Sequence, residues 1–138
     1  MTTEIPGFGG RREAREEALA VLYEVELTSE TVFDALAARE VPPGDYAIEL
    51  AEGVDDEVDD LDAIISRHLT GWRIERMPLI DKVLARIATW ELLRRSDVPT
   101  GVVLSEAVEL ATQYSGDQSP RFINGVLRSV ANELRSSE

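Results

Sequence analysis

The chain has 138 residues, a formal net charge of −13, 43% hydrophobic residues and no cysteine. That length suits one domain with a continuous core or two small bundles that share one. The absence of cysteine excludes disulfides, thiolate catalysis and cysteine metal sites. Because no apolar run approaches the roughly 20 residues of a membrane span and the N-terminus lacks the pattern of a signal peptide, we expect a cytoplasmic protein without a membrane association.

The spacing of apolar residues is helical in every segment, and none alternates as a β-strand does. We expect residues 1–10 to form a flexible, glycine-rich lead-in and residues 11–135 to form a single all-helical domain. The first helix is predicted over residues 11–28. It has two apolar faces, because Leu19, Tyr23 and Leu27 lie opposite its main stripe. Such a helix lies either at the centre of a bundle or between the bundle and a partner.

Further helices are predicted along the rest of the chain, around residues 32–36, 45–69, 78–95, 104–111 and 119–134. Thr31 and Asp34 match a capping box at the start of the short second helix. Gly53 is a candidate break within the long third stretch. In the last helix, Ser119 is the expected N-cap and Pro120 the first helical residue.

Metal and catalytic sites find little support in the sequence. The acidic run at residues 55–62 lacks the glycine and the glutamate that a calcium-binding loop requires at its sixth and twelfth positions. It keeps helical spacing, which indicates a solvated helix face. His68 is the only histidine, so a histidine metal cluster is excluded and no nucleophile is paired with it. We expect no metal, cofactor or small-molecule substrate, and His68 is either a surface residue or an RNA contact.

Basic residues are concentrated near the N-terminus of an otherwise acidic region. Residues 1–62 contain 18 of the 27 acidic side chains and four of the 14 basic ones, of which Arg11, Arg12 and Arg15 lie within five positions. At the start of a helix, arginines and free backbone amides together favour a phosphate. The alternative is an ordinary surface in which these arginines pair with nearby carboxylates.

The start of the last predicted helix has a second candidate arrangement. Arg121 lies on its solvent side, and Phe122 lies at the edge of its apolar stripe. An arginine, an aromatic ring and free amides are what an unpaired RNA base and its phosphate require. Alternatively, Phe122 widens the core. Gly125 is unfavourable within a helix, and we expect it to permit the close approach of another helix.

Several segments of the chain resemble the NusB family, in order and with similar gaps: GRREAR (10–15), residues 68–72, 76–82, 84–92, 96–99 and 105–111, and SPRFINGVL (119–127). Each segment alone is weakly specific, but together they extend from Gly10 to about Leu134. The resemblance implies an all-α fold of two small three-helix bundles packed into one compact domain. It also implies a protein without enzymatic activity.

The family resemblance implies a function in transcription antitermination within the elongation complex. It implies binding to the boxA RNA of ribosomal RNA operon transcripts, together with NusE, a small-subunit ribosomal protein that forms a heterodimer with NusB. By position, it places Tyr23 and Asp81 at the surface that meets the protein partner. With Arg121 added from the helix pattern, the expected RNA-binding residues are Arg11, Arg12, Arg15, His68, Gln118, Arg121 and Phe122.

Two other functions remain open. A NusB-like RNA-binding domain also precedes the catalytic domain of some ribosomal RNA methyltransferases, so the chain could be such a domain. A helical adaptor that binds only proteins would suit the acidic charge.

Overall fold

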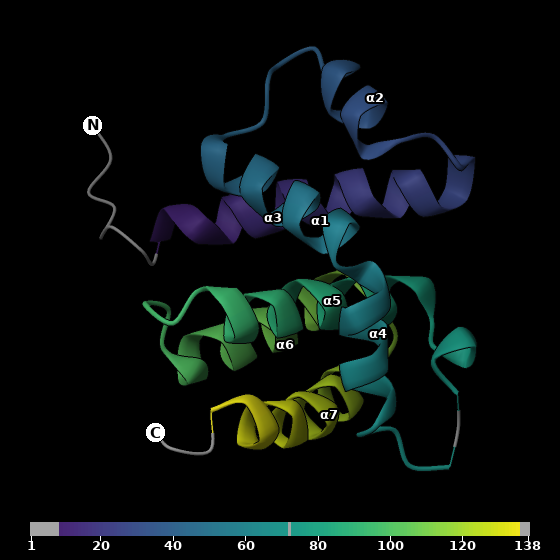
Figure 1. The fold of residues 1–138 in the computed structure, drawn as a ribbon, viewed down its shortest axis with the longest axis vertical. Helices are drawn as coiled ribbons and strands as arrows, with labels where there is room; N and C mark the ends of the chain where they lie inside the picture. Colours follow the sequence, from purple (N-terminus) through teal and green to yellow (C-terminus); the bar gives the residue numbers. More distant parts are fainter. Residues whose placement is uncertain (1–8, 72, 136–138) are drawn as a thin grey trace.

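The computed structural model describes residues 9–71 and 73–135, and no strand occurs among them (Figure 1). Its elements are the helices α1 (Gly9–Thr28), α2 (Val32–Ala37), α3 (Asp45–Asp56), α4 (Val58–Ser66), α5 (Leu79–Arg94), α6 (Thr100–Tyr114) and α7 (Ser119–Leu134), with the short 3-10 helix η1 (Ile74–Arg76) before α5. The all-helical prediction is confirmed. No helix in the described part of the chain is both long and apolar enough to cross a membrane.

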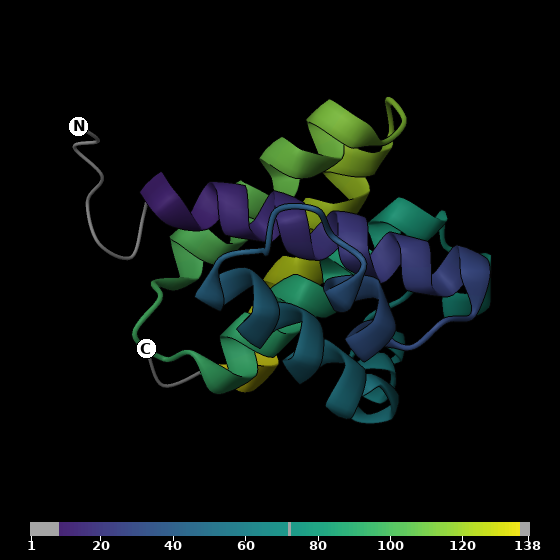
Figure 2. The ribbon, with the colours of Figure 1, turned by 90° about the horizontal axis from the view of Figure 1, so that it is seen from above.

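The helices pack in two groups of three, joined by α4. In the first group α1 packs along α3, and α2 contacts both; in the second group α5, α6 and α7 contact one another. Seen from above, α1 lies across the second group (Figure 2), where it packs on α5. Helix α4 follows α3 directly and packs on α5 and α7. The core is therefore continuous between the two groups.

The ends of the first two helices follow from local side-chain and backbone chemistry. Helix α1 begins at Gly9, two residues before the predicted start, and the first eight residues of the expected lead-in lie outside the described residues. It is followed by Ser29, whose positive φ of 61° is the left-handed conformation that ends many helices. Thr31 is the N-cap of α2, and its hydroxyl accepts a hydrogen bond from the Asp34 amide at 3.0 Å.

The predicted break at Gly53 is wrong, because the long third stretch divides at Glu57. Glu57 lies between α3 and α4 with non-helical φ and ψ of −116° and 19°. Its carboxylate accepts hydrogen bonds from Trp90 Nε1 at 3.1 Å and from Arg94. Gly53 remains helical and has a different role. A Cβ added there would lie 2.4 Å from the Trp90 ring, so only glycine lets α3 approach α5 this closely.

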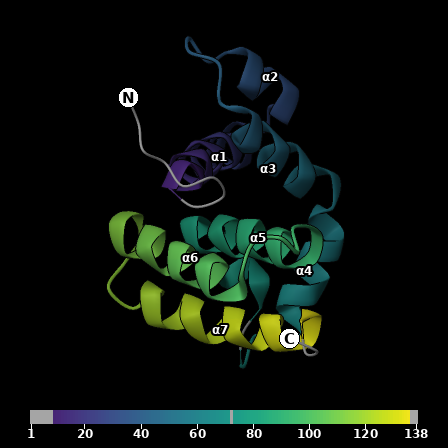
Figure 3. The same ribbon diagram turned by 90° about the vertical axis from the view of Figure 1, so that its left-hand side faces the viewer.

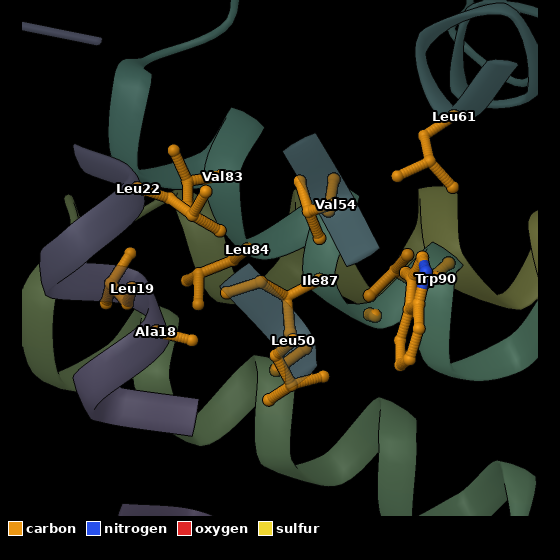
Figure 4. Packing of buried hydrophobic residues seen from close by; sticks show 14 of the residues in the cluster. Ala18, Leu19, Leu22, Leu50, Val54, Leu61, Val83, Leu84, Ile87 and Trp90 are labelled. Atoms are coloured by element: carbon orange, nitrogen blue, oxygen red, sulfur yellow. The ribbon is translucent and has the colours of Figure 1, made fainter. Parts of the chain in front are cut away.

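Buried aliphatic residues from both groups meet around α5 (Figure 4). Leu22 of α1 and Val54 of α3 are in the same cluster as α5 residues Val83, Leu84 and Ile87. Not every apolar residue is buried. Phe33 of α2 is 76% exposed and Leu27 near the end of α1 is 61% exposed, so the pattern of these two helices overestimates their buried faces.

The last helix differs from its prediction in two details. Gln118 is the N-cap of α7, while Ser119 is its first residue and is buried. Gly125 is exposed, and a Cβ added to it would meet no atom within 4 Å. The expectation that Gly125 lets another helix of this chain approach closely is therefore wrong.

Candidate nucleic-acid interface

The arginine cluster at the start of α1 divides between the interior and the surface. Arg15 is 2% exposed. It donates two hydrogen bonds to Glu91 of α5, from Nε at 2.9 Å and from Nη2 at 2.8 Å. Tyr46 of α3 donates a third to Glu91 at 2.6 Å, and burial, then the charge of Glu91, raises the pKa of the Tyr46 hydroxyl. The prediction that Arg15 contacts RNA is therefore corrected, because its guanidinium is enclosed and paired.

The buried position of Arg15 has a signal in the sequence that the arginine cluster obscured. Arg15, Ala18 and Leu22 lie three and then four residues apart, which places all three on one helix face, and the latter two are buried. The partner, Glu91, lies within an α5 segment that is buried on nearly every side. Two charged residues on apolar faces of different helices are candidates for such a pair, since buried charges are paired.

Arg11 and Arg12 remain at or near the surface. Arg12 is exposed and donates to Glu106 of α6 from Nε at 3.0 Å and from Nη2 at 2.6 Å. The hydrogen bond from Arg12 lowers the pKa of Glu106. Arg11 is partly buried, with its guanidinium 4.5 Å from the centre of the Tyr46 ring and 3.6 Å from Asp97. An incoming phosphate would therefore compete with an existing carboxylate at both arginines.

The start of α7 presents the most open group of predicted residues. Gln118 and Arg121 are exposed, and Phe122 is partly buried against the edge of the core. Among the described arginines, only three have a side chain with neither an ion pair nor a hydrogen bond: Arg76, Arg121 and Arg128. The backbone amide of Phe122 donates to the Gln118 carbonyl at 3.2 Å. This arrangement leaves a cation and an aromatic edge together at one helix start.

The predicted partner-binding residues have different surroundings. Asp81 is 1% exposed and accepts hydrogen bonds from Ser115 at 2.6 Å and Ser119 at 2.7 Å. It holds the start of α5 to the segment between α6 and α7, so the prediction that it meets a partner directly is corrected. Tyr23 is partly exposed and lines an apolar surface hollow of 260 Å³ with Leu19 and residues of α5 and α6.

His68 lies apart from the start of α7. Its Nε2 is 2.7 Å from Glu133 Oε1 near the end of α7, and Arg67 pairs with the same carboxylate. Hydrogen bonds from Arg67 and then His68 lower the pKa of Glu133 to about 2. Phe122 and Glu133 are separated by about 16 Å along the helix axis. The structure therefore does not bring His68 and Phe122 into one compact site.

A family model for the NusB family matches residues 12–132. The chain belongs to the NusB family. It is similar to the transcription antitermination protein NusB of Pseudarthrobacter chlorophenolicus, with 46% identity over 87% of this chain and 91% of the relative. The protein of the same name from Kineococcus radiotolerans is 41% identical over 94% of this chain and 98% of the relative.

Solved structures of family members share this fold. NusB of T. maritima superposes with a TM-score of 0.83 at 30% identity, covering 91% of this chain and 93% of that one. A chain from the crystal structure of antitermination factors NusB and NusE in complex with double-stranded RNA gives a TM-score of 0.77 at 25% identity, covering 89% and 96%. The agreement extends over both helix groups.

Proposed function

We propose that this protein is a transcription antitermination factor that binds the boxA RNA of ribosomal RNA operon transcripts together with NusE. The observation that carries the proposal is the start of α7. There, Gln118 and Arg121 are exposed beside Phe122, in a chain whose family members include a NusB solved with NusE and RNA. Arginine binds phosphate bidentately, and a partly exposed aromatic ring such as that of Phe122 stacks on an unpaired base.

The RNA surface in this proposal comprises the exposed predicted residues at two helix starts, Arg12 of α1 and the α7 group, with Arg11 beside Arg12. Arg15 supports the surface from inside by holding α1 on α5. His68 is a peripheral contact near the other end of α7. Since the protein has a net charge of −13, we expect weak binding to RNA alone and tighter binding once a basic protein partner adds its own charge.

The apolar hollow beside Tyr23 is the proposed docking surface for NusE. It lies between α1, the start of α5 and the end of α6, and its lining includes Leu19, Ile80 and Tyr114. Glu16 lies at the same hollow, where its carboxylate accepts a hydrogen bond from the Tyr114 hydroxyl at 2.6 Å. An apolar surface with an acidic border suits a basic ribosomal protein. Asp81 contributes from beneath by fixing the α6–α7 connection.

On this proposal the protein acts on nascent transcripts in the cytoplasm and catalyses no reaction. Its curated relatives, matched over 91% and 98% of their own lengths, are named antitermination proteins. That similarity favours an antitermination factor over the RNA-binding domain of a methyltransferase. The exposed start of α7 favours an RNA-binding protein over an adaptor that binds only proteins.

The proposal is tested by an electrophoretic mobility shift with a boxA RNA oligonucleotide, using the full chain with and without purified NusE. We expect a weak shift with the chain alone and a tighter ternary complex when NusE is present. A scrambled RNA of the same length and composition is the control for non-specific binding. A chain that binds NusE but leaves the RNA affinity of NusE unchanged is a protein-binding adaptor, and the RNA function is then wrong.

A further inference from the structure

A hollow of 440 Å³ lies on the surface between α6 and α7, and no predicted contact uses it. Gly101, Ser105, Val108 and Glu109 line it from α6, and Asn124 and Arg128 line it from α7. Its lining therefore combines small and aliphatic side chains with an amide, a hydroxyl, a carboxylate and a cation. Such a mixture suits a flat heterocycle with polar edges that is linked to an anion.

The hollow lies between the two parts of the proposed RNA surface. Helix α6 lies between α1 and α7 (Figure 3), and Arg12 of α1 is paired with Glu106 on α6. On the other side, Phe122 and Arg128 belong to the same helix. At about 100° per residue, Gly125 lies midway between them, about 60° from each around the axis of α7. A strand that runs from Phe122 to the hollow and on towards Arg12 crosses α7 over Gly125.

Gly125 has no explanation within the packing of this chain. Glycine is among the least favourable residues inside a helix, and a Cβ at this position would touch no atom within 4 Å. A bare, exposed backbone between Phe122 and Arg128 permits a ligand to approach closely. The Arg128 side chain makes no ion pair or hydrogen bond with the described residues, so its charge is available at the edge of the same crossing.

We infer that the α6–α7 hollow is a binding site for one unpaired nucleotide of the bound RNA, and that the strand reaches it over Gly125. This inference rests on the proposed RNA function. Arg128 holds the phosphate on the α7 side, and Val108 and its aliphatic neighbours contact the base. Asn124 and Ser105 bind polar edges of the base. The Glu109 carboxylate accepts a hydrogen bond from an exocyclic amino group, which selects cytosine, adenine or guanine over uracil.

The first test changes Gly125 to alanine and to leucine in the full chain bound to NusE. Because the position is open, both variants should melt at or above the temperature of the unmodified protein. Gly125→Leu should weaken boxA RNA binding at least fivefold, and Gly125→Ala less. The matched control is Ala63→Leu, at an exposed position of α4 outside this face, which should leave RNA affinity unchanged. A folded Gly125→Leu protein with unchanged affinity would overturn the inference.

The second test locates the nucleotide. Arg128→Gln should weaken RNA binding about threefold to tenfold, while Arg76→Gln, which removes an unpaired exposed charge elsewhere, should not. An abasic substitution scanned along the RNA should reveal a position at which base loss weakens the unmodified protein but not Gly125→Leu. At that position uracil should bind more weakly than cytosine, and Glu109→Gln should reduce this preference.

The two tests separate the inference from the proposed function. If Arg121→Gln weakens RNA binding while the Gly125, Arg128 and Glu109 variants bind normally, the RNA function stands and the nucleotide site is wrong. If the unmodified protein with NusE shows no preference for boxA over scrambled RNA, both are wrong.

Discussion

Arg15 of α1 and Glu91 of α5 form a buried ion pair with two parallel hydrogen bonds of 2.9 Å and 2.8 Å. The pair joins the two helix groups across their shared core, and Tyr46 of α3 completes it with a hydrogen bond to Glu91. Arg15, which the family resemblance places among the RNA-binding residues, thus holds the two helix groups together. Its replacement should therefore affect folding.

Replacing Arg15 should destabilise the protein strongly. Arg15→Ala leaves the Glu91 carboxylate buried without its counter-ion, which costs about 3–5 kcal/mol. Arg12→Ala, which breaks the exposed pair with Glu106, should cost about 0–1 kcal/mol. Urea denaturation of the two variants measures the difference. Equal destabilisation of the two variants would show that the Arg15–Glu91 pair does not hold the two helix groups together.

Phe122 should contribute to both RNA binding and stability, because it is partly buried at the core edge. Phe122→Ala should cost about 1–3 kcal/mol of RNA affinity from lost stacking. Its folding cost should remain below the ~3–5 kcal/mol of a fully buried phenylalanine. Phe33→Ala, at a 76% exposed position of α2, is the control and should change neither. Calorimetry and RNA titration on the same sample separate the effects; normal RNA affinity in folded Phe122→Ala assigns the ring to the core alone.

Salt dependence should distinguish the arginines of the proposed RNA surface from exposed arginines elsewhere. Arg12→Gln and Arg121→Gln should each reduce the slope of log affinity against log salt by about one, because each removes a phosphate contact and its released counter-ion. Fluorescence anisotropy of labelled boxA RNA with the NusE complex, between low and moderate salt, gives the slopes. Arg94→Gln, whose parent residue pairs with Glu57, is the control for removing a positive charge elsewhere. Slopes that do not differ among the three variants would contradict the proposed surface.

Glu133 should titrate near pH 2 in the folded protein, since Arg67 and His68 lower its pKa to about 2 from an ordinary value of 4.5. A lowered folded-state pKa stabilises the fold above pH 4.5, and this contribution disappears as the pH falls from there towards 2. Carbon-13 NMR of the labelled carboxylate follows the titration directly. In Arg67→Gln, the midpoint should move upwards towards 4.5. An unshifted midpoint in that variant would show that Arg67 is not the main cause.

Helical periodicity predicts the elements well because most of the helices bury a continuous apolar stripe. It fails where a contact with a distant helix determines the point at which a helix ends. Gly53 resembles a helix break, but its lack of a side chain serves the approach to Trp90, and the chain bends instead at Glu57, which Trp90 and Arg94 hold by hydrogen bonds. No local pattern contains that information, because the partners are more than 30 residues away.

The candidate site was predictable in composition but not in exposure. The sequence indicates arginines at one helix start and an aromatic residue at another, and it places Phe122 at the edge of its apolar stripe, as observed. It does not distinguish Arg12 from Arg15, because the difference depends on which carboxylate each meets from a distant helix. Asp81 illustrates the same limit, since Ser115 and Ser119 enclose it only after α6 and α7 have packed.

The joining of the two helix groups has a consequence for how the protein would read RNA. Arg12 belongs to one group and Phe122 to the other, and Glu57 and Glu91 fasten the groups together through α5. These bonds hold α1 against the second group, so on the proposed function the two contact points lie a fixed length of RNA apart. On the proposed function, an inserted nucleotide between the two contacted positions must bulge outwards, whereas a deleted one leaves one end out of reach.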